Sequence, residues 1–192
     1  MKNGVQQKTW SVLLIILLVS TMGGMAFFSN GLAAPMTKDT KLDRDMMTKF
    51  ILSTVKAART IYVKSVLRKV KKAGLKATET WVKEDHAVML PAQFVKALGY
   101  EIQGYELSLV GSEPLYKNNL PKTPKEKEML AKLASSKEKM VTFQDGTQYK
   151  GMSADFAISQ GCADCHNQHA NTQKRDWKKG DFMGAIIIRM RG

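Results

Sequence analysis

The chain has only two cysteines and three histidines among its 192 residues. Two cysteines are enough for one disulfide or for one covalent cofactor. The chain also shows no Ser/His/Asp set, no carboxylates paired for acid–base catalysis and no phosphate-binding loop. Because no known arrangement of enzyme groups is present, we expect a protein that is not an enzyme. There are no internal repeats and no low-complexity tracts.

Acidic residues are scarce: 17 Asp and Glu stand against 30 Lys and Arg, which gives a formal charge of +13. Such an excess attracts acidic partners in general, including an acidic redox or signalling protein and the membrane surface. The chain has no nucleic-acid-binding motif, and acids alternate with the basic residues in most segments. We therefore expect no nucleic-acid binding. A solvated, lysine-rich surface is the simplest interpretation of the charge.

Long hydrophobic runs are also absent, with one exception at the amino terminus. "WSVLLIILLVSTMGGMAFF" (10–28) follows Lys2 and Lys8 and precedes the small residues of "GLAAP". A basic start, an apolar core and a small-residue exit are typical of a secretory signal, although the run is also just long enough to span a bilayer. We expect 1–34 to be a signal peptide or N-terminal anchor, 35–40 a linker and 41–192 one domain. The domain is then periplasmic or extracytoplasmic, either soluble after cleavage or held at the membrane by residues 10–28.

Helical patterns dominate the first part of the domain. The stretch 40–74 predicts one long helix that starts with Thr40 as cap and ends at Gly74. Shorter helices are predicted over 89–99, ended by Gly99, and over 123–136, capped by Thr123. The predicted apolar face of the long helix comprises Met47, Phe50, Ile51, Val55, Ala58, Ile61, Tyr62, Val66 and Val70.

Strand patterns come mostly later. We expect strands at 105–110 and 183–190, and a hairpin within 140–158 that turns at Asp145-Gly146. Helices early and strands late indicate an α+β fold, in which an antiparallel sheet is covered on one face by a helix.

The segment "CADCH" combines both cysteines with a histidine: Cys162, Cys165 and His166. Two thiols separated by two residues can add to the two vinyl groups on one edge of a haem. A histidine directly after the second cysteine then falls under the iron as the proximal ligand. This spacing is the attachment pattern of c-type haem, so it predicts one covalent haem c.

Three other uses of the cysteines stay open. A redox dithiol requires a cysteine of low pKa, usually at a helix start in a strand-helix-strand context, which the preceding sequence does not show. A zinc site has four ligands if His169 joins the motif, but adjacent Cys165 and His166 reach one metal poorly. A structural disulfide accounts for the cysteines and leaves His166 without a role.

Segments spread over 43–190 support the haem interpretation by their order: "TVKAARTIYV", "MLPAQFVKAL", "SEPLYKNNLP", "KEKEML", "CADCHNQH" and "DWKKGDFMGAIII". In this order the chain resembles the PAS-like c-type haem sensor domain, a family of exported single-haem domains. The resemblance implies a PAS-like antiparallel sheet with the haem packed against it. It implies thioether bonds at Cys162 and Cys165 and His166 as the proximal iron ligand.

Members of that family are taken to sense redox state or small gases, or to carry electrons. Some supply a distal cysteine from the first helix, a role that cannot be transferred because this chain has no third cysteine. His86 is the candidate distal ligand, with a surface histidine as the simpler interpretation. His169 follows His166 too closely to reach the opposite haem face. Methionines such as Met89 and Met152 are more often core filler than ligands.

Two functions therefore remain in view. The first is electron transfer by an exported cytochrome, which the basic surface and the lack of an output domain favour. The second is a haem-based redox or gas sensor that signals through another protein, which the family resemblance favours.

Overall fold

The computed structural model describes residues 43–191. The expected signal peptide or anchor, the linker and the cap at Thr40 lie outside these residues. In the described part, no helix is both long and apolar enough to cross a bilayer.

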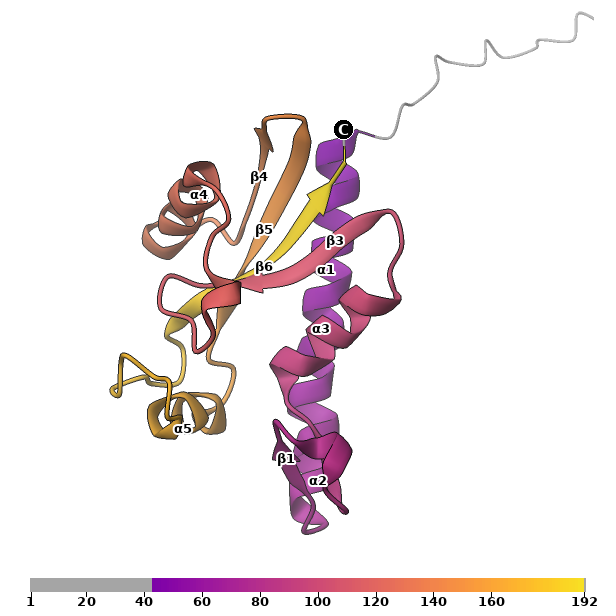
Figure 1. Cartoon of the computed structure of the whole chain (residues 1–192), viewed down its shortest axis with the longest axis vertical. Helices are drawn as coiled ribbons and strands as arrows, with labels where there is room; N and C mark the ends of the chain where they lie inside the picture. The colour runs from indigo at the N-terminus through magenta and orange to yellow at the C-terminus, as the bar shows by residue number, and fades with distance from the viewer. Residues whose placement is uncertain (1–42, 192) are drawn as a thin grey trace, which may run out of the picture. The chain divides into compact units, whose positions relative to one another are not determined.

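One continuous helical rod opens the described chain and runs along the sheet (Figure 1). It consists of α1 (Arg44–Ile61), a π-helical segment η1 (Tyr62–Leu67) and α2 (Arg68–Lys72). Asp43 is the cap, and its Oδ1 accepts a hydrogen bond of 3.1 Å from the Asp45 amide. Gly74 follows the helix end with φ 81°, as expected for a residue that stops a helix.

The buried face of this rod differs from the predicted one. Val55 is buried as expected, but Phe50 and Ile61 are 61% and 60% exposed and Val66 is exposed as well. The residues that face inward follow one another in steps of three or four: Thr48, Leu52, Val55, Arg59, Val63 and Leu67. The wider π turn lets steps of four continue along one face, whereas the prediction assumed an α-helical period throughout.

The remaining elements lie largely where the sequence patterns place them. In chain order they are β1 (Lys76–Thr78), η2 (Trp81–Lys83), β2 (Ala87–Met89), α3 (Pro91–Glu101), β3 (Tyr105–Val110), η3 (Lys117–Asn119), α4 (Pro124–Ser135), β4 (Met140–Asp145), β5 (Gln148–Phe156), α5 (Gln160–Gln168) and β6 (Phe182–Met190).

Helix α4 shows the predicted cap: Thr123 Oγ1 accepts from the Glu126 amide at 3.1 Å, with Pro124 in the first turn. Helix α3, in contrast, does not end at Gly99 but continues to Glu101. A Cβ at position 99 would lie 2.5 Å from the carbonyl oxygen of Leu107. Gly99 is therefore needed for the close packing of α3 on β3, and it does not terminate the helix.

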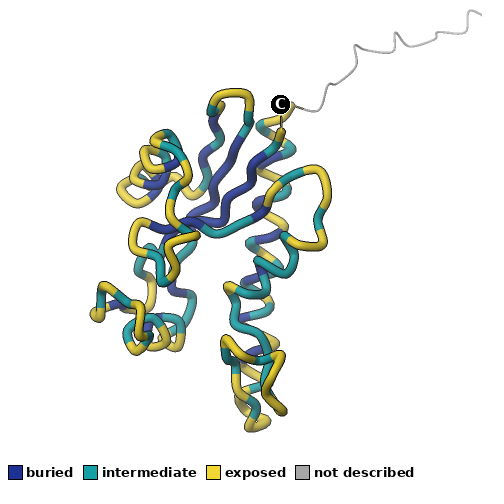
Figure 2. The backbone as a smooth tube through the Cα atoms, in the orientation of Figure 1, coloured by how far each residue is buried: buried dark blue, intermediate teal, exposed yellow. Residues whose placement is uncertain are grey.

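The main sheet has four antiparallel strands in the order β3-β6-β5-β4, and β1 and β2 form a separate parallel pair. Helices α1 and α3 pack on one face of the sheet through Leu52, Val55 and Val95. Helix α4 packs on the other face through Leu130 and Leu133. The fold is α+β as predicted, but helices cover both faces instead of one. Figure 2 shows the buried residues concentrated along the strands.

A buried ion cluster joins α4 to the sheet. Glu126 is fully buried and pairs with Lys150 of β5 at 2.8 Å and with Arg189 of β6 at 2.7 Å. Burial alone would raise the pKa of Glu126, but hydrogen bonds from Arg189 and Lys150 lower it to about 2. The cluster holds α4 in one position on the sheet.

The pairing of β5 with β6 shifts register at Asp155 and Phe156, opposite Gly184. Gly184 has φ 137°, and a Cβ there would meet the Val110 carbonyl oxygen at 2.3 Å. This irregularity ends the regular ladder where β5 leads toward α5, and bulges of this kind often redirect side chains beside functional sites.

Candidate functional site

Helix α5 carries the whole CxxCH motif. Ser159 precedes it in extended conformation, which is the usual geometry for a serine at the start of a helix. Within the helix, Cys165 and His166 lie three and four residues after Cys162. Side chains at these spacings share one face of a helix. Helix formation therefore presents two thiols and an imidazole together.

The segment after α5 folds back and holds His166. Asn167 Oδ1 accepts from the Trp177 amide at 2.8 Å, and its Nδ2 donates to the Trp177 carbonyl at 3.0 Å. The Trp177 ring is buried and meets the His166 ring edge-on, with 6.1 Å between centroids. Lys174 Nζ lies over the Trp177 ring, 4.3 Å from its centre. Asn167 thus fixes the indole, and the indole fixes the imidazole.

His166 is in the state that a metal ligand requires. Burial lowers its pKa below the ordinary value, and the nearby His169 and Arg59 act in the same direction. The imidazole is therefore neutral at pH 7 and has a free lone pair. Its Nδ1 is buried and has no hydrogen-bond partner among the described residues.

No disulfide joins Cys162 to Cys165. The Cys162 Sγ lies 3.3 Å from Ser159 Oγ. Burial raises the pKa of Cys165, as do the charges of Glu79 and Cys162, while Lys71 partly opposes the shift. The raised pKa argues against Cys165 as the attacking thiolate of a redox dithiol.

A cavity of about 1230 Å³ lies beside α5, and Cys162, Cys165 and His166 all line it. It is bounded by the end of the sheet, by the second half of the helical rod, and by the β2–α3 segment. In Figure 1, α5 lies on one side of this region, and α3 and α2 lie on the other. Most of the exposed wall is apolar, contributed by residues such as Leu109 and Val63.

The cavity wall also carries charge. Arg59 Nη1 and Asp155 Oδ1 form an ion pair of 2.8 Å in which both side chains are largely buried. Burial raises the pKa of Asp155, although Arg59 and Lys56 counteract part of the rise. Arg59 Nε is buried and has no acceptor among the described residues.

Beyond α5, His169 joins a polar cluster with Glu79 and Tyr116. Tyr116 donates to Glu79 at 2.6 Å, and His169 Nε2 lies 3.4 Å from both partners. The hydrogen bond to Glu79 raises the pKa of Tyr116 to about 12. The cluster ties the end of α5 to two loops of the cavity wall.

The chain matches a known protein family over almost all of the residues that the structure describes. The family model Tll0287-like matches residues 38–191 of this chain. The chain belongs to the Tll0287-like family. Among solved structures, the crystal structure of the cyanobacterial haem protein Tll0287 is similar with a TM-score of 0.43 and 13% identity, covering 53% of this chain and 69% of that one. No curated protein matches. The family resemblance inferred from the sequence is thereby confirmed.

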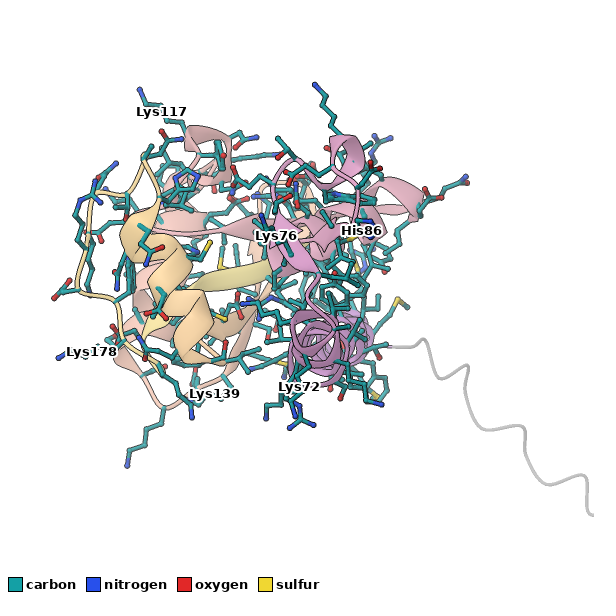
Figure 3. The ribbon with its side chains drawn as sticks, turned by 90° about the horizontal axis from the view of Figure 1, so that it is seen from below. Lys72, Lys76, His86, Lys117, Lys139 and Lys178 are labelled. Atoms are coloured by element: carbon teal, nitrogen blue, oxygen red, sulfur yellow. The ribbon has the colours of Figure 1, made fainter. Side chains whose placement is uncertain are left out.

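In this Tll0287-like chain, some of the predicted site residues line the cavity and others do not. It brings Cys162, Cys165 and His166 together on the cavity. His86 is exposed at the start of β2 and is not among the residues that line the cavity. Figure 3 shows it at the far side of the β1–β2 region from α5. Met89 lines the cavity, as does Met183, whereas Met152 is fully buried in the core.

The zinc alternative finds no support in the arrangement. Across residues 43–191, no three His, Cys, Asp or Glu side chains gather in a way that could hold a metal ion. His169 contacts Glu79 and Tyr116 instead of joining the motif.

Several residues of this Tll0287-like site escaped the sequence analysis: Arg59, Glu79, Tyr116, Asp155, Asn167 and Trp177. They come from separate segments that only the fold brings together. One signal was available, because Arg59 interrupts the apolar side of a helix, and a buried arginine there requires a partner or a ligand.

Proposed function

We propose that this protein is an exported mono-haem c-type cytochrome that acts in electron transfer. Cys162 and Cys165 form the thioether bonds, and His166 is the proximal iron ligand. The observation that carries the proposal is the joint exposure of these three side chains, on one helix face, to a cavity of about 1230 Å³.

The residues fit a haem in three respects. The cavity is larger than the roughly 300–1,000 Å³ of most small-molecule sites, and its wall is mainly apolar, which suits a macrocycle. His166 is neutral and its ring is fixed by Trp177. A bound haem would supply a one-electron redox centre whose potential depends on its axial ligands and burial.

The distal position has candidates within the cavity wall. The sulfur donors there are Met89 and Met183, whereas His86 lies elsewhere. A thioether in this position would fill the iron's coordination and suit an electron carrier.

The basic composition supports an acidic protein as redox partner, since complementary charge accelerates encounter. Membrane association would come from residues 10–28, and the location we propose is periplasmic. We also infer that the sheet is PAS-like, in keeping with the family resemblance.

The alternative is a haem-based sensor that signals through another protein. The large cavity favours it, because space beside the iron would admit a small gas. A PAS-like sheet would transmit the change to a partner.

One preparation tests the proposal and separates these roles. The full chain is produced in a host that matures cytochromes c, and a pyridine haemochrome assay is performed. We expect one c-type haem per chain, and a ferrous spectrum that carbon monoxide leaves unchanged. Rapid carbon monoxide binding would overturn electron transfer in favour of sensing, and the absence of covalent haem would overturn both.

A further inference from the structure

The cavity wall is distinctly basic on the side of the helical rod. Arg59, Lys64, Arg68 and Lys71 all line it from that rod, and Lys96 lines it from α3. The acids on the wall are Glu79 and Asp155. Asp155 is paired with Arg59 and Glu79 accepts from Tyr116. Five cations against two acids leave an excess of three positive charges around a largely apolar space.

Four of these five cations have no carboxylate partner within residues 43–191, although Lys96 Nζ lies 5.9 Å from the centre of the Tyr116 ring. Among the described residues, no carboxylate lies within 4.0 Å of Lys64, Arg68, Lys71 or Lys96. The Nζ of Lys71 extends toward α5 and comes within 3.5 Å of the place where a Cβ on Gly161 would be. Lys71 therefore lies beside the helix that bears the cysteines, and the other cations of the rod that line the cavity are Arg59, Lys64 and Arg68.

Arg59 adds a buried donor without an acceptor. The side chain is 7% exposed, its Nη1 is paired with Asp155, and its Nε has no partner among the described residues. A buried donor left without a partner is unfavourable, so an added acceptor would stabilise it. Asp155 pairs with Nη1 of the guanidinium, and because the Arg59 side chain lines the cavity, an anion bound there would meet N–H groups that Asp155 leaves free.

We propose that Arg59, Lys64 and Arg68 form a carboxylate-binding site for the acidic substituents of the cavity ligand. The inference rests on the proposed function, under which these substituents are the two propionates of haem. Arg59 is the buried contact, and Lys64 and Arg68 are the exposed, partly hydrated contacts. The site sets the orientation of the macrocycle, because its acidic edge must face the rod when its other edge is bonded to α5.

The test uses the full chain with Cys162→Ala and Cys165→Ala, so that haem binds reversibly. Iron protoporphyrin IX and its dimethyl ester are titrated into it and followed by the Soret band. We expect the free acid to bind about tenfold or more tightly than the ester, because charge-assisted hydrogen bonds to carboxylates are lost in the ester. Higher ionic strength should reduce the ratio between the affinities for the free acid and the ester, because salt screens the charges.

Variants locate the effect. Lys64→Gln with Arg68→Gln should weaken binding of the free acid and so reduce the ratio between the affinities for acid and ester. Arg59→Gln is combined with Asp155→Asn, so that no buried charge is left unpaired. This double variant should reduce the ratio between the affinities for acid and ester further. Lys178→Gln is the control, since Lys178 is exposed and points away from the protein in Figure 3.

The outcomes are distinguishable. Equal affinity for acid and ester, or a loss of both in the Lys64 and Arg68 variant, overturns the carboxylate site while haem binding stands. Failure of both porphyrins to bind the chain without cysteines also overturns this inference, whereas the proposed function is decided separately by the covalent haem of the native sequence.

Discussion

At the scale of single residues, the site depends on how His166 is held. Its ring has no hydrogen-bond partner at Nδ1 in the described residues, so orientation comes from packing against Trp177. Trp177 is in turn fixed through its backbone by the Asn167 amide. The motif could be predicted from spacing because its chemistry is local. Trp177 could not, because its contact with His166 depends on the loop between them.

Asn167→Leu should therefore loosen the site. It removes both hydrogen bonds and leaves the Trp177 amide and carbonyl unpaired, which predicts a loss of about 1–3 kcal/mol in the free energy of unfolding. Urea unfolding measures it. Asn171→Leu is the control, because the Asn171 side chain is exposed and has no hydrogen-bond partner among the described residues. Equal stability of the two variants would contradict the role of Asn167.

His86→Ala should leave the visible spectrum of the haem-loaded protein unchanged. His86 is exposed, has φ 59° and does not line the cavity. Ferric and ferrous spectra are compared with those of the unmodified chain. A displaced Soret band, or new binding of carbon monoxide, would show that His86 is the distal ligand after all.

At the scale of elements, the order and type of the longer helices and strands follow from the sequence. Periodicity and caps such as Thr123 are local, and the structure shows the corresponding elements. Two predictions about the helices were wrong: which residues of the rod face inward, and where α3 ends. The π turn at Tyr62–Leu67 shifts the inward face of the rod, and Gly99 is a packing contact within α3. Both depend on neighbours that are distant in sequence. The short pair β1 and β2 has no distinctive pattern and was missed.

Gly99→Ala tests the packing role. The added methyl would lie 2.5 Å from the Leu107 carbonyl, so α3 must move away from β3. Overpacking of this kind costs about 1–3 kcal/mol, and Gly99→Val should cost more. Thermal unfolding compares the series. If Gly99 had no packing role, Gly99→Ala would raise the free energy of unfolding instead, because position 99 lies inside α3 and alanine favours helix over glycine.

At the scale of the whole molecule, the domain has a tightly packed sheet with a cavity at one end of its strands. The ion cluster at Glu126 secures α4 to one sheet face, while the cavity occupies the far end of the strands. The sequence could not place Lys150 and Arg189 beside Glu126, because 24 and 63 residues separate the partners.

Because of this cluster, we expect the free energy of unfolding to fall in acid. The pKa of Glu126 is about 2 in the folded protein and ordinarily 4.5. A depressed pKa stabilises the folded state fully above the ordinary value, and that stability is lost as pH falls toward 2. The loss is about 3 kcal/mol by linkage. Unfolding by urea between pH 6 and about pH 2 measures it. Glu126→Gln should be less stable near neutrality and show a smaller decrease, and an unchanged pH profile would contradict the assignment.

The central claim is that one haem is bound covalently through the α5 cysteines. Intact-mass spectrometry tests it directly on the full chain and on Cys162→Ser with Cys165→Ser, both produced in a host that matures cytochromes c. The account predicts that the native sequence gains the mass of one haem, which survives acid-acetone extraction, and that the double variant gains none. An unmodified mass for the native sequence, or a haem retained covalently by the double variant, would contradict it.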